Sequence, residues 1–354
     1  MRVVVAMSGG VDSAVAAAQL VDAGHEVIGL SMQLYDQQAG DRQFGGCCSL
    51  DDLHEARRTA GTLGIPHYMM NFERQFDAAV VSTFVREYAL GRTPIPCVQC
   101  NGELKFAHLL DRAAAFGADA VATGHYARLD RHTDPARTLL QRGLDPEKDQ
   151  SYFLFTLTQA QLARAVFPVG HLHKAEVRAY ARARGLAVAD KPDSQELCFV
   201  ADGNTARFVE ERQPSVARAG VIRDQRGRQV GLHSGVHRFT VGQRKGLGLS
   251  TPVPLYVLSI DAVENALTVG PRPALERTHL TASSVNWVAG TPPDTTAQIT
   301  ARIRHRHPDA TAAVEPLPDD RVAVVFDEPQ TAVAPGQAVV FYDSDTVLGG
   351  GWID

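Results

Sequence analysis

Two groups of residues in this chain of 354 residues have types and spacings that could do chemistry. The first is the hexapeptide Ser-Gly-Gly-Val-Asp-Ser at residues 8–13, which follows an apolar run at 3–7 and precedes a helix-like stretch at 14–21. The run predicts a short strand, and the paired glycines permit a tight turn. The amide groups and dipole at the start of the next helix favour an anion. These features favour a phosphate-binding loop over an ordinary glycine turn.

The hexapeptide also limits which nucleotide chemistry is expected. No Gly-x-x-x-x-Gly-Lys-Ser/Thr pattern occurs here, so the lysine that reaches the β- and γ-phosphates in P-loop NTPases is missing. Ser-Gly-Gly-Val-Asp-Ser instead resembles the pyrophosphate loop of the N-type ATP pyrophosphatases, which activate a carbonyl oxygen as its adenylate and release pyrophosphate. Asp12 is a candidate ligand for Mg²⁺. Alternatively, Asp12 is a solvent-facing residue at the start of a helix.

Composition indicates a soluble enzyme. Hydrophobic residues make up 44% of the chain, and no apolar run approaches the roughly 20 residues that cross a bilayer. The first seven residues are too short for the core of a signal peptide, so we expect a cytoplasmic protein without a membrane partner. Five cysteines, an odd number, favour chemistry or metal binding over disulfides. The net charge of −5 requires any RNA contact to come from local patches.

The first half of the chain alternates strand-like and helix-like segments. The strands are expected at 3–7, 26–32, 66–72 and 118–126, and the helices at 14–21, 76–88 and 102–116, the last capped by Asn101. This alternation predicts an α/β fold with a mostly parallel sheet covered by helices on both faces. Ser8, Met32 and Gly124 fall at the carboxyl ends of strands, where such sheets bind ligands. One nucleotide could therefore touch all three.

The second half of the chain has a different pattern. The last strong helical pattern covers 174–184, and from about residue 220 short alternating runs are broken by Gly, Pro and Asp. Strands are expected at 238–241, 255–259, 321–326 and 337–342, and hairpin loops at 129–137 and 224–229. We expect a catalytic domain that resembles the ATP pyrophosphatases at 1–204, a central β-rich module at 205–275 and a C-terminal β-barrel at 276–354.

The second chemical group consists of cysteines. Cys97 and Cys100 lie just ahead of the predicted helix, in a segment stiffened by Pro94 and Pro96. A helix N-terminus stabilises the thiolate, which is the nucleophilic and metal-binding form. A Cys-x-x-Cys pair most often binds zinc or is redox-active. A lone cysteine such as Cys198 is typically a small buried hydrophobic residue. It therefore has a chemical function only if the fold brings its segment to the segment that carries Cys97 and Cys100.

Several motifs, in order, resemble those of the tRNA-specific 2-thiouridylase family, and the resemblance spans essentially the whole chain. They are residues 8–13, Gly-Cys-Cys-Ser at 46–49, residues 93–101, Ala-Thr-Gly-His-Tyr at 122–126, Lys-Asp-Gln-Ser-Tyr at 148–152, residues 194–199 and residues 239–246. The resemblance implies a transferase that adenylates the C2 oxygen of the wobble uridine and replaces that oxygen by sulfur, releasing AMP and pyrophosphate.

The resemblance also implies roles for individual residues. ATP would be bound by Ala6, Met7, Ser8, Gly9, Gly10, Val11, Asp12, Ser13, Met32 and Gly124. Cys100 would be the nucleophile and Cys198 the carrier of a persulfide. The tRNA would be contacted by Ile95, Pro96, Cys97, His125, Lys148, Asp149, Gln150, Arg304, His305 and Gln337. The implied partners are tRNAs for lysine, glutamate and glutamine, and a cysteine desulfurase or sulfur-relay protein as the sulfur donor.

The chemistry supports the same assignment. A uracil C2 carbonyl is a poor electrophile, and adenylation turns its oxygen into a good leaving group. Sulfur attack then requires a soft nucleophile, which a persulfide on a cysteine of low pKa supplies. Mg²⁺ and the donors of the loop are candidates to stabilise the negative charge that develops.

One position departs from the family pattern. Many members carry Asp where this chain has Cys97, and Asn where it has Ile95. The additional thiol opens a second mechanism, in which Cys97, Cys100 and Cys198 hold a 4Fe-4S cluster whose remaining iron binds sulfide. Zinc is a third alternative. The sequence leaves persulfide and cluster chemistry open. Cys47 and Cys48 sit in a glycine-flanked loop that favours a structural role.

The basic run at 302–307 is the main candidate surface for RNA. It is expected on a strand of the barrel, where alternate side chains share a face that could follow phosphates. Most such runs are merely solvated. Gln243, Arg244 and Lys245 form a second patch in a glycine-rich loop. Two other functions stay open: an ATP pyrophosphatase synthetase or ligase acting on a small molecule, and a non-catalytic RNA-binding or metal-sensing protein.

Overall fold

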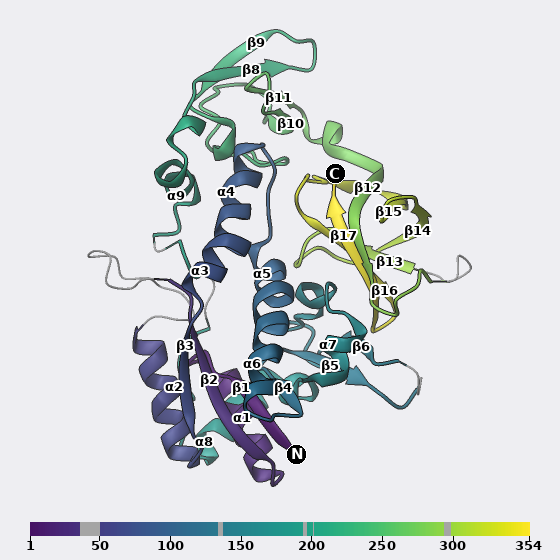
Figure 1. The fold of residues 1–354 in the computed structure, drawn as a ribbon. Helices are drawn as coiled ribbons and strands as arrows, with labels where there is room; N and C mark the ends of the chain where they lie inside the picture. The colour runs from purple at the N-terminus through teal and green to yellow at the C-terminus, as the bar shows by residue number, and fades with distance from the viewer. Residues whose placement is uncertain (36–49, 134–136, 194–196, 201, 294–298) are drawn as a thin grey trace.

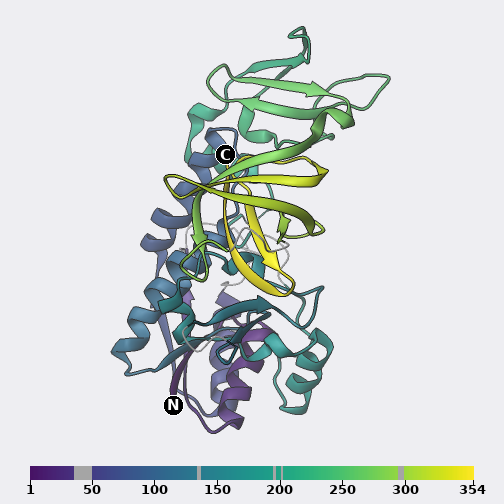
Figure 2. The same ribbon diagram turned by 90° about the vertical axis from the view of Figure 1, so that its right-hand side faces the viewer.

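Three β-sheets follow one another along the chain (Figure 1). The computed structural model describes residues 1–35, 50–133, 137–193, 197–200, 202–293 and 299–354. Cys47, Cys48 and the start of the motif at 194–199 lie outside the described residues. In Figure 2 the C-terminal barrel lies between the central module and the part of the chain that contains the N-terminal sheet.

The N-terminal sheet is parallel throughout, which confirms the predicted α/β class. Its strands lie in the order β3-β2-β1-β4-β7. Their bounds are β1 Arg2–Ala6, β2 Glu26–Gln33, β3 His67–Asn71, β4 Ala120–Ala122 and β7 Ala165–Val166. β4 is shorter than the expected strand at 118–126, because the chain leaves the sheet at Thr123.

Helices cover both faces of this sheet. Both faces need cover because successive side chains of β1 point to opposite faces and are all apolar from Val3 to Val5. Val3 and Val5 share a hydrophobic cluster with Ala17 of α1 and Ala56 of α2, whereas Val4 belongs to the cluster on the opposite face. The helices around the sheet are α1 Val11–Asp22, α2 Leu50–Leu63, α3 Glu73–Phe76, α4 Ser82–Ala89, α6 Leu109–Ala115, α7 Gln159–Arg164 and α8 Lys174–Ala183. A π-helical segment, Asp77–Val81, joins α3 to α4.

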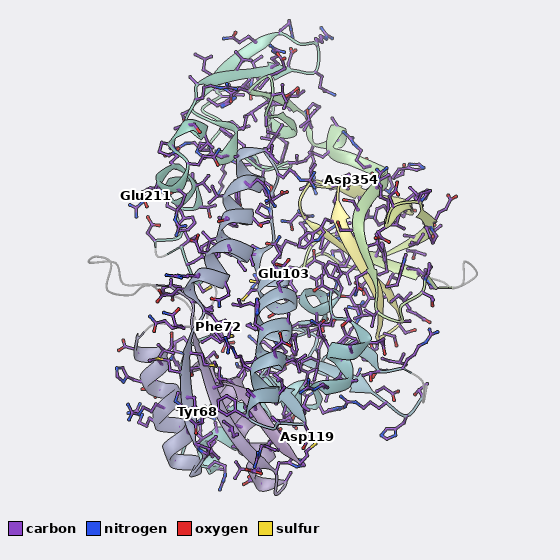
Figure 3. All side chains as sticks on the ribbon, viewed as in Figure 1. Tyr68, Phe72, Glu103, Asp119, Glu211 and Asp354 are labelled. Carbon is purple, nitrogen blue, oxygen red and sulfur yellow. The ribbon has the colours of Figure 1, made fainter. Side chains whose placement is uncertain are left out.

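Large aromatic side chains fill the space between the edge strand β3 and the helix opposite it (Figure 3). Tyr68 lies 5.1 Å from Phe116 between ring centroids, and Phe72 is 2% exposed within the cluster that contains α6.

No helix in the described part of the chain combines the length and the apolar character that crossing a membrane demands.

The helix that carries Cys97 and Cys100 begins earlier than expected. α5 (Pro96–Gln99) continues directly into the π-helix Cys100–His108 and then into α6. The prediction that Asn101 caps this helix is wrong, because proline at the first helical position starts it at Pro96. Asn101 lies inside it and donates from Nδ2 to the Phe153 carbonyl at 3.2 Å. Both cysteines therefore lie in the first two turns.

The central module is built on a four-stranded sheet in the order β10-β11-β8-β9. Its elements are α9 Thr205–Arg212, β8 Gly220–Asp224, β9 Gln229–His233, β10 Tyr256–Asp261 and β11 Ala266–Gly270. The hairpin loop predicted at 224–229 joins β8 to β9. The strand expected at 238–241 is absent from this described segment, because Val236–Arg238 forms a 3₁₀ turn and Gly242 takes a φ of +90°. α9 was not expected from the sequence.

The C-terminal strands form a closed barrel. The sheet order β12-β15-β14-β13-β16-β17 is completed by pairing between β12 and β17. The bounds are β12 Glu276–Trp287, β13 Ile299–Arg302, β14 Ala310–Leu317, β15 Arg321–Thr331, β16 Ala338–Asp343 and β17 Thr346–Ile353. The prediction that 302–307 lies on a strand is wrong beyond its first residue, because β13 ends at Arg302 and the chain turns.

A hairpin of the N-terminal half joins this barrel. β5 (Ala127–Asp130) and β6 (Leu139–Arg142) flank the hairpin loop expected at 129–137. β6 then pairs with β17 at Gln141 and Thr346, so the barrel sheet extends into the N-terminal half.

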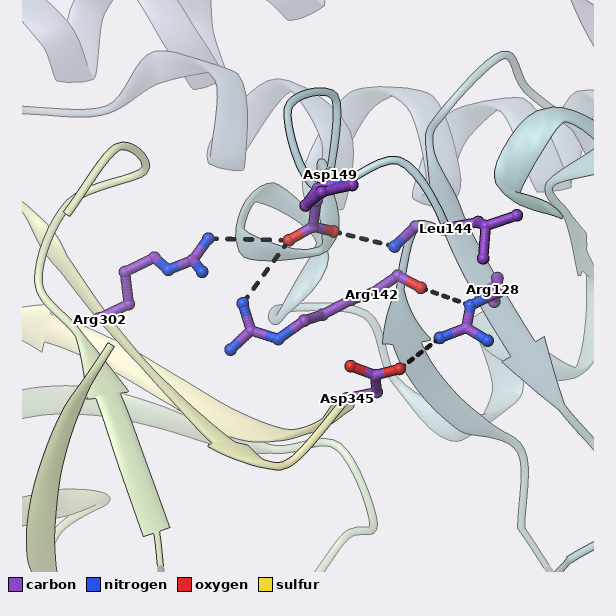
Figure 4. Close-up of a pocket in the computed structure, with 8 residues that line it drawn as sticks. Arg128, Arg142, Leu144, Asp149, Arg302 and Asp345 are labelled. Carbon is purple, nitrogen blue, oxygen red and sulfur yellow. Dashed lines mark hydrogen bonds and ion pairs between the residues drawn. The ribbon is translucent and has the colours of Figure 1, made fainter. Parts of the chain in front are cut away.

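Ion pairs reinforce this junction (Figure 4). The Asp149 carboxylate is 5% exposed and accepts hydrogen bonds from the Gly143 and Ser151 amides at 3.0 Å. The guanidinium groups of Arg142 and Arg302 lie 3.9 and 3.7 Å from it. These groups line a cavity of about 230 Å³ between the hairpin and the barrel.

Replacing Asp149 by Ala should cost about 3 kcal/mol of unfolding free energy. The change removes the acceptor of several buried hydrogen bonds and leaves two guanidinium groups less compensated. Urea denaturation followed by the fluorescence of Trp287 and Trp352, both in the barrel, measures this cost. Asp345→Ala is the control, because Asp345 pairs with Arg128 near the surface and should cost under about 1 kcal/mol. Equal costs for the two variants would contradict the assignment.

Candidate nucleotide and sulfur-transfer site

The loop at 8–10 has the geometry of an anion site. Gly9 has a φ of +73°, and a side chain there would collide with the Asp52 carbonyl oxygen. The N-cap residue of α1 is Gly10, which has no side chain to cap the helix, so the first amides of α1 point out of the helix toward the loop. The hydroxyl oxygens of Ser8 and Ser13 lie 3.2 Å apart beside them. The loop therefore presents hydroxyl and amide donors together.

The other residues predicted to bind ATP lie at the same edge of the sheet. Met32 is buried near the carboxyl end of β2, and Gly124 follows the carboxyl end of β4. A Cβ on Gly124 would lie 2.6 Å from the Ser13 amide nitrogen, so the β4 segment packs against the start of α1. Ala6 ends β1, and the Met7 carbonyl accepts a 2.7 Å hydrogen bond from the Ser31 hydroxyl. The structure thus gathers these residues around the loop.

Asp12 has two polar partners that sequence reasoning missed. Lys174 Nζ lies 2.7 and 2.9 Å from its two carboxylate oxygens, and the Tyr126 hydroxyl donates to Oδ1 at 2.7 Å. Burial, reinforced by the negative charge of Asp12, raises the pKa of Tyr126 far above its usual value, so the phenol stays a donor. Lys174 is 162 positions from Asp12, and a single sequence carries no signal for this pairing.

Further cations surround the loop. Lys191 Nζ donates to the Gly9 carbonyl at 2.9 Å and pairs with Asp52. Lys174 and Lys148 each lie 2.8 Å from Asp193. Burial alone would raise the pKa of Asp193, but the hydrogen bonds from Lys148 and Lys174 outweigh it and lower that pKa to about 2. Asp193 is therefore ionised at neutral pH and holds the two lysines together.

The fit of Mg²⁺ depends on Asp12. Within the described residues no group of three or more His, Cys, Asp or Glu side chains could hold a metal ion. Mg²⁺ in nucleotide sites needs only one or two carboxylates because the phosphates supply other ligands. Asp12 can act as a Mg²⁺ ligand only if its contact with the Lys174 ammonium group is replaced by a contact with the ion. Bound there, Mg²⁺ would neutralise phosphate charge.

Cys100 and Cys198 contact one hydrophobic core. Cys100 is buried, Cys198 is partly buried, and both pack in the cluster that contains α4 and α6. Phe199 anchors the Cys198 segment there, with its ring 5.0 Å from Phe84 and 5.6 Å from Phe76. Both segments therefore pack into the same core.

Cys97 differs from the other two cysteines. It is exposed at the start of the helix. Among the described residues, Cys97, Cys100 and Cys198 do not form a group of three ligands that could hold a metal ion.

The segment before Cys97 is held by all three parts of the chain. The Thr93 amide donates to the Pro335 carbonyl and the Thr93 carbonyl accepts from Gln337 Nε2, both at 2.8 Å. The Thr93 hydroxyl lies 3.1 Å from that of Thr240 in the central module. Pro96 is buried, and Ile95 is half-buried at the N-cap of α5. Gln337, predicted to contact tRNA, thus also positions the cysteine segment.

The remaining residues predicted to contact tRNA fall into two groups. Asp149 and Gln150 face inward, since the Gln150 side chain accepts from the Tyr126 amide at 3.0 Å. The His305 ring lies 4.4 Å from the Phe153 ring between centroids, tilted by 37°, and its Nε2 lies 3.0 Å from the Asp149 carbonyl oxygen. His125, Lys148 and Arg304 are half-buried, as Gln150 and His305 are.

Comparisons with known proteins identify the family. The chain matches family models described as "tRNA methyl transferase HUP domain" over 1–202, "tRNA methyl transferase PRC-barrel domain" over 206–271 and "Aminomethyltransferase beta-barrel domain" over 277–353. A protein of Geotalea uraniireducens named "tRNA-specific 2-thiouridylase MnmA" is 54% identical over 100% of this chain and 95% of its own length. One of the same name from Magnetococcus marinus is 51% identical over 99% and 98%. The chain belongs to the tRNA-specific 2-thiouridylase family.

Solved structures resemble parts of this family member more distantly. An NMN synthetase from Francisella tularensis has a TM-score of 0.35 and 19% identity over 60% of this chain and 76% of its own. A 4-thiouridine synthetase in complex with RNA and bound ATP has a TM-score of 0.35 and 14% identity over 60% and 50%. Likenesses this weak do not bear on function.

Asp12→Ala and Ser13→Ala should each reduce pyrophosphate release by about 100-fold or more while tRNA affinity changes by less than about twofold. These residues face the predicted phosphate site and stabilise charge there. A pyrophosphate assay and a gel shift on the same preparations measure both effects. Asp22→Ala, at the far end of α1, is the control and should retain activity. Lost tRNA binding with normal pyrophosphate release would refute the assignment.

Arg304→Glu should weaken tRNA binding and reduce the slope of log affinity against log salt by about one, because a phosphate contact is lost. Its Nη2 donates to the Thr331 carbonyl at 3.3 Å, so the side chain is held beside the barrel and can still reach solvent. Arg321→Glu, a paired surface arginine of the same barrel, is the control. An unchanged slope for Arg304→Glu would mean that the basic run at 302–307 is a solvated surface without a phosphate contact.

Proposed function

We propose that this chain is an ATP-dependent tRNA-uridine 2-sulfurtransferase that thiolates C2 of the wobble uridine. The observation that carries the proposal is the packing of Cys100 and Cys198 into one core, in a chain that also presents a glycine phosphate loop at the start of a helix. Relatives named tRNA-specific 2-thiouridylases match it over 95% and 98% of their length, which supports the same activity.

The proposed reaction begins with adenylation. The C2 oxygen attacks the α-phosphorus of ATP, and the bond to the bridging oxygen breaks, so that pyrophosphate leaves with the electron pair. The amides of the loop and the hydroxyls of Ser8 and Ser13 hold the phosphates during this step. Mg²⁺, held through Asp12, supplies additional charge neutralisation.

Sulfur transfer follows from the two cysteines. The terminal sulfur of a Cys198 persulfide attacks C2, and AMP leaves with the former C2 oxygen. Cys100 then attacks the Cys198 sulfur, which releases the 2-thiouridine and leaves a Cys100–Cys198 disulfide that an external thiol reduces.

The partners and cofactors follow from this proposal. ATP and Mg²⁺ are the cofactors, a cysteine desulfurase or sulfur-relay protein reloads Cys198, and tRNAs for lysine, glutamate and glutamine are the substrates. We assign adenylation to residues 1–204 and RNA contact to the barrel at 276–354, with the module at 205–275 between them. The site of action is the cytoplasm.

Analysis of the reaction product distinguishes thiolation from two other activities. The family models carry the name methyl transferase, and a small-molecule ligase would share the phosphate loop. Thiolation predicts pyrophosphate release that depends on tRNA and a product mass that reflects exchange of oxygen for sulfur. An added methyl group, or pyrophosphate release without tRNA, would favour the alternatives.

Replacement of Cys97 separates persulfide from cluster chemistry. Because Cys97 is exposed and the cysteines do not gather around one point, Cys97→Asp should retain at least about half of the thiolation activity and contain no iron. The measurement is 2-thiouridine formed by anaerobically reconstituted protein, alongside iron per chain. Cys100→Ser and Cys198→Ser are the matched inactive variants.

Two outcomes would revise this proposal. Loss of both iron and thiolation in Cys97→Asp would establish the cluster route, since removing one of three ligands leaves too few thiolates to retain the iron. An active Cys198→Ser variant would overturn the sulfur-transfer site under either route.

A further inference from the structure

The phosphate loop contains no cation of its own. Its six residues include two serines, two glycines, one valine and Asp12, which is an anion. A nucleotide triphosphate brings further negative charge to this place, and pyrophosphate gains more as it leaves. The loop amides and hydroxyls alone do not neutralise this charge, so another element must supply a cation.

Lys174, the first residue of α8, lies at the loop. Its Nζ contacts both carboxylate oxygens of Asp12 and Oδ1 of Asp193, and its side chain is only 12% exposed. Three cations, Lys148, Lys174 and Arg178, contact the two carboxylates Asp12 and Asp193, and the Asp145 carboxylate accepts from the Lys174 backbone amide. Lys174 is the cation that contacts the carboxylate of the loop itself, so an anion that enters the loop is attracted to its ammonium group.

The other cations are committed to different contacts. Arg178 donates to the Ala189 and Lys191 carbonyls at 2.8 and 3.0 Å, which ties it to the backbone after α8. Lys191 binds the Gly9 carbonyl and Asp52, so it fixes the shape of the loop. Lys148 contacts Asp193 and has no recorded contact with Asp12. Lys191 contacts only the backbone of the hexapeptide, whereas Lys174 contacts its one charged side chain, that of Asp12.

We infer that Lys174 binds the β- and γ-phosphates of the nucleotide and neutralises the departing pyrophosphate, in place of the lysine that a P-loop carries within its own sequence. The inference rests on the proposed function in taking ATP as the ligand. In the nucleotide-free protein Asp12 holds the ammonium group in readiness. When the triphosphate enters, Nζ turns from Asp12 to the phosphates, and Asp12 becomes accessible to Mg²⁺.

The role is electrostatic. When the bond between the α-phosphorus and the bridging oxygen breaks, the electron pair stays on that oxygen and increases the charge on the β-phosphate. Lys174 keeps its proton and stabilises this charge, and no proton transfer is required. Removing its positive charge therefore weakens the binding of every ligand that contains the β- and γ-phosphates. The binding of ligands that lack these phosphates is unchanged.

Calorimetric titration without tRNA tests this selectivity. ATP, inorganic pyrophosphate and AMP are titrated in turn into the wild type and into Lys174→Met, which keeps the length of the side chain but removes its charge. We expect the Kd of ATP and of pyrophosphate to rise by about tenfold or more, and that of AMP to change by less than about twofold. Lys174→Arg restores the charge and should recover most of the affinity for ATP.

Two control variants separate ligand binding from structural support. Arg182→Met alters an exposed residue of the same helix that pairs with Asp190, and it should leave all three affinities unchanged. Lys191→Met should weaken ATP and AMP together, because it loosens the loop that holds the α-phosphate as well. An equal loss of ATP and AMP affinity in Lys174→Met would overturn the inference and reduce Lys174 to a support of Asp12.

The result is independent of the sulfur chemistry. If Lys174→Met discriminates between ATP and AMP but no 2-thiouridine is formed by the wild type, the proposed function fails and the inference about Lys174 stands. If 2-thiouridine is formed but the variant treats ATP and AMP alike, the inference fails and the proposed function stands.

Discussion

The parallel pairing of β1 with β2 on one side and with β4 on the other is the constraint on which the site depends. It places the ends of three segments, distant in sequence, at one edge of the sheet. The absence of a side chain at Gly124 then lets the β4 segment pack directly against the start of α1. Loop, helix start and neighbouring strand ends thereby form one surface with a fixed arrangement of donors.

A second constraint acts on the cysteines. Thr93 is bonded to the barrel through its amide and carbonyl groups and to the central module through its hydroxyl. Three residues later the helix that carries Cys97 and Cys100 begins. The reactive segment is therefore positioned by parts of the chain that lie more than a hundred residues away. This arrangement couples the placement of the barrel, which we propose to contact RNA, to that of the thiols.

The sequence allowed much of this architecture to be predicted, because local patterns report local structure. The apolar run at 3–7 and the glycine pair predicted the strand, loop and helix of the phosphate site. The start of the cysteine helix was misplaced at Asn101, because the proline at Pro96 was interpreted as a stiff approach and not as a first helical residue. The strand expected through 302–307 failed because a run of basic residues has no period that distinguishes strand from turn.

The cations around the loop could not be predicted in the same way. Lys174 and Lys191 reach it from positions 162 and 182 residues away, and only the folded chain brings them there. Asp149, by contrast, was expected at the RNA surface on the strength of its motif. Its burial among arginines reflects the docking of the barrel, which is a long-range property.

The shared ladder between β6 and β17 has a consequence for how the chain folds. Because β17 closes the barrel through β12 and also pairs with a strand of the N-terminal half, its synthesis completes two structures at once. Until β17 has been made, β6 presents an unpaired edge, the kind of edge that recruits other chains. The nascent N-terminal half is thus exposed to aggregation during synthesis, and its protection arrives with the eight residues of β17.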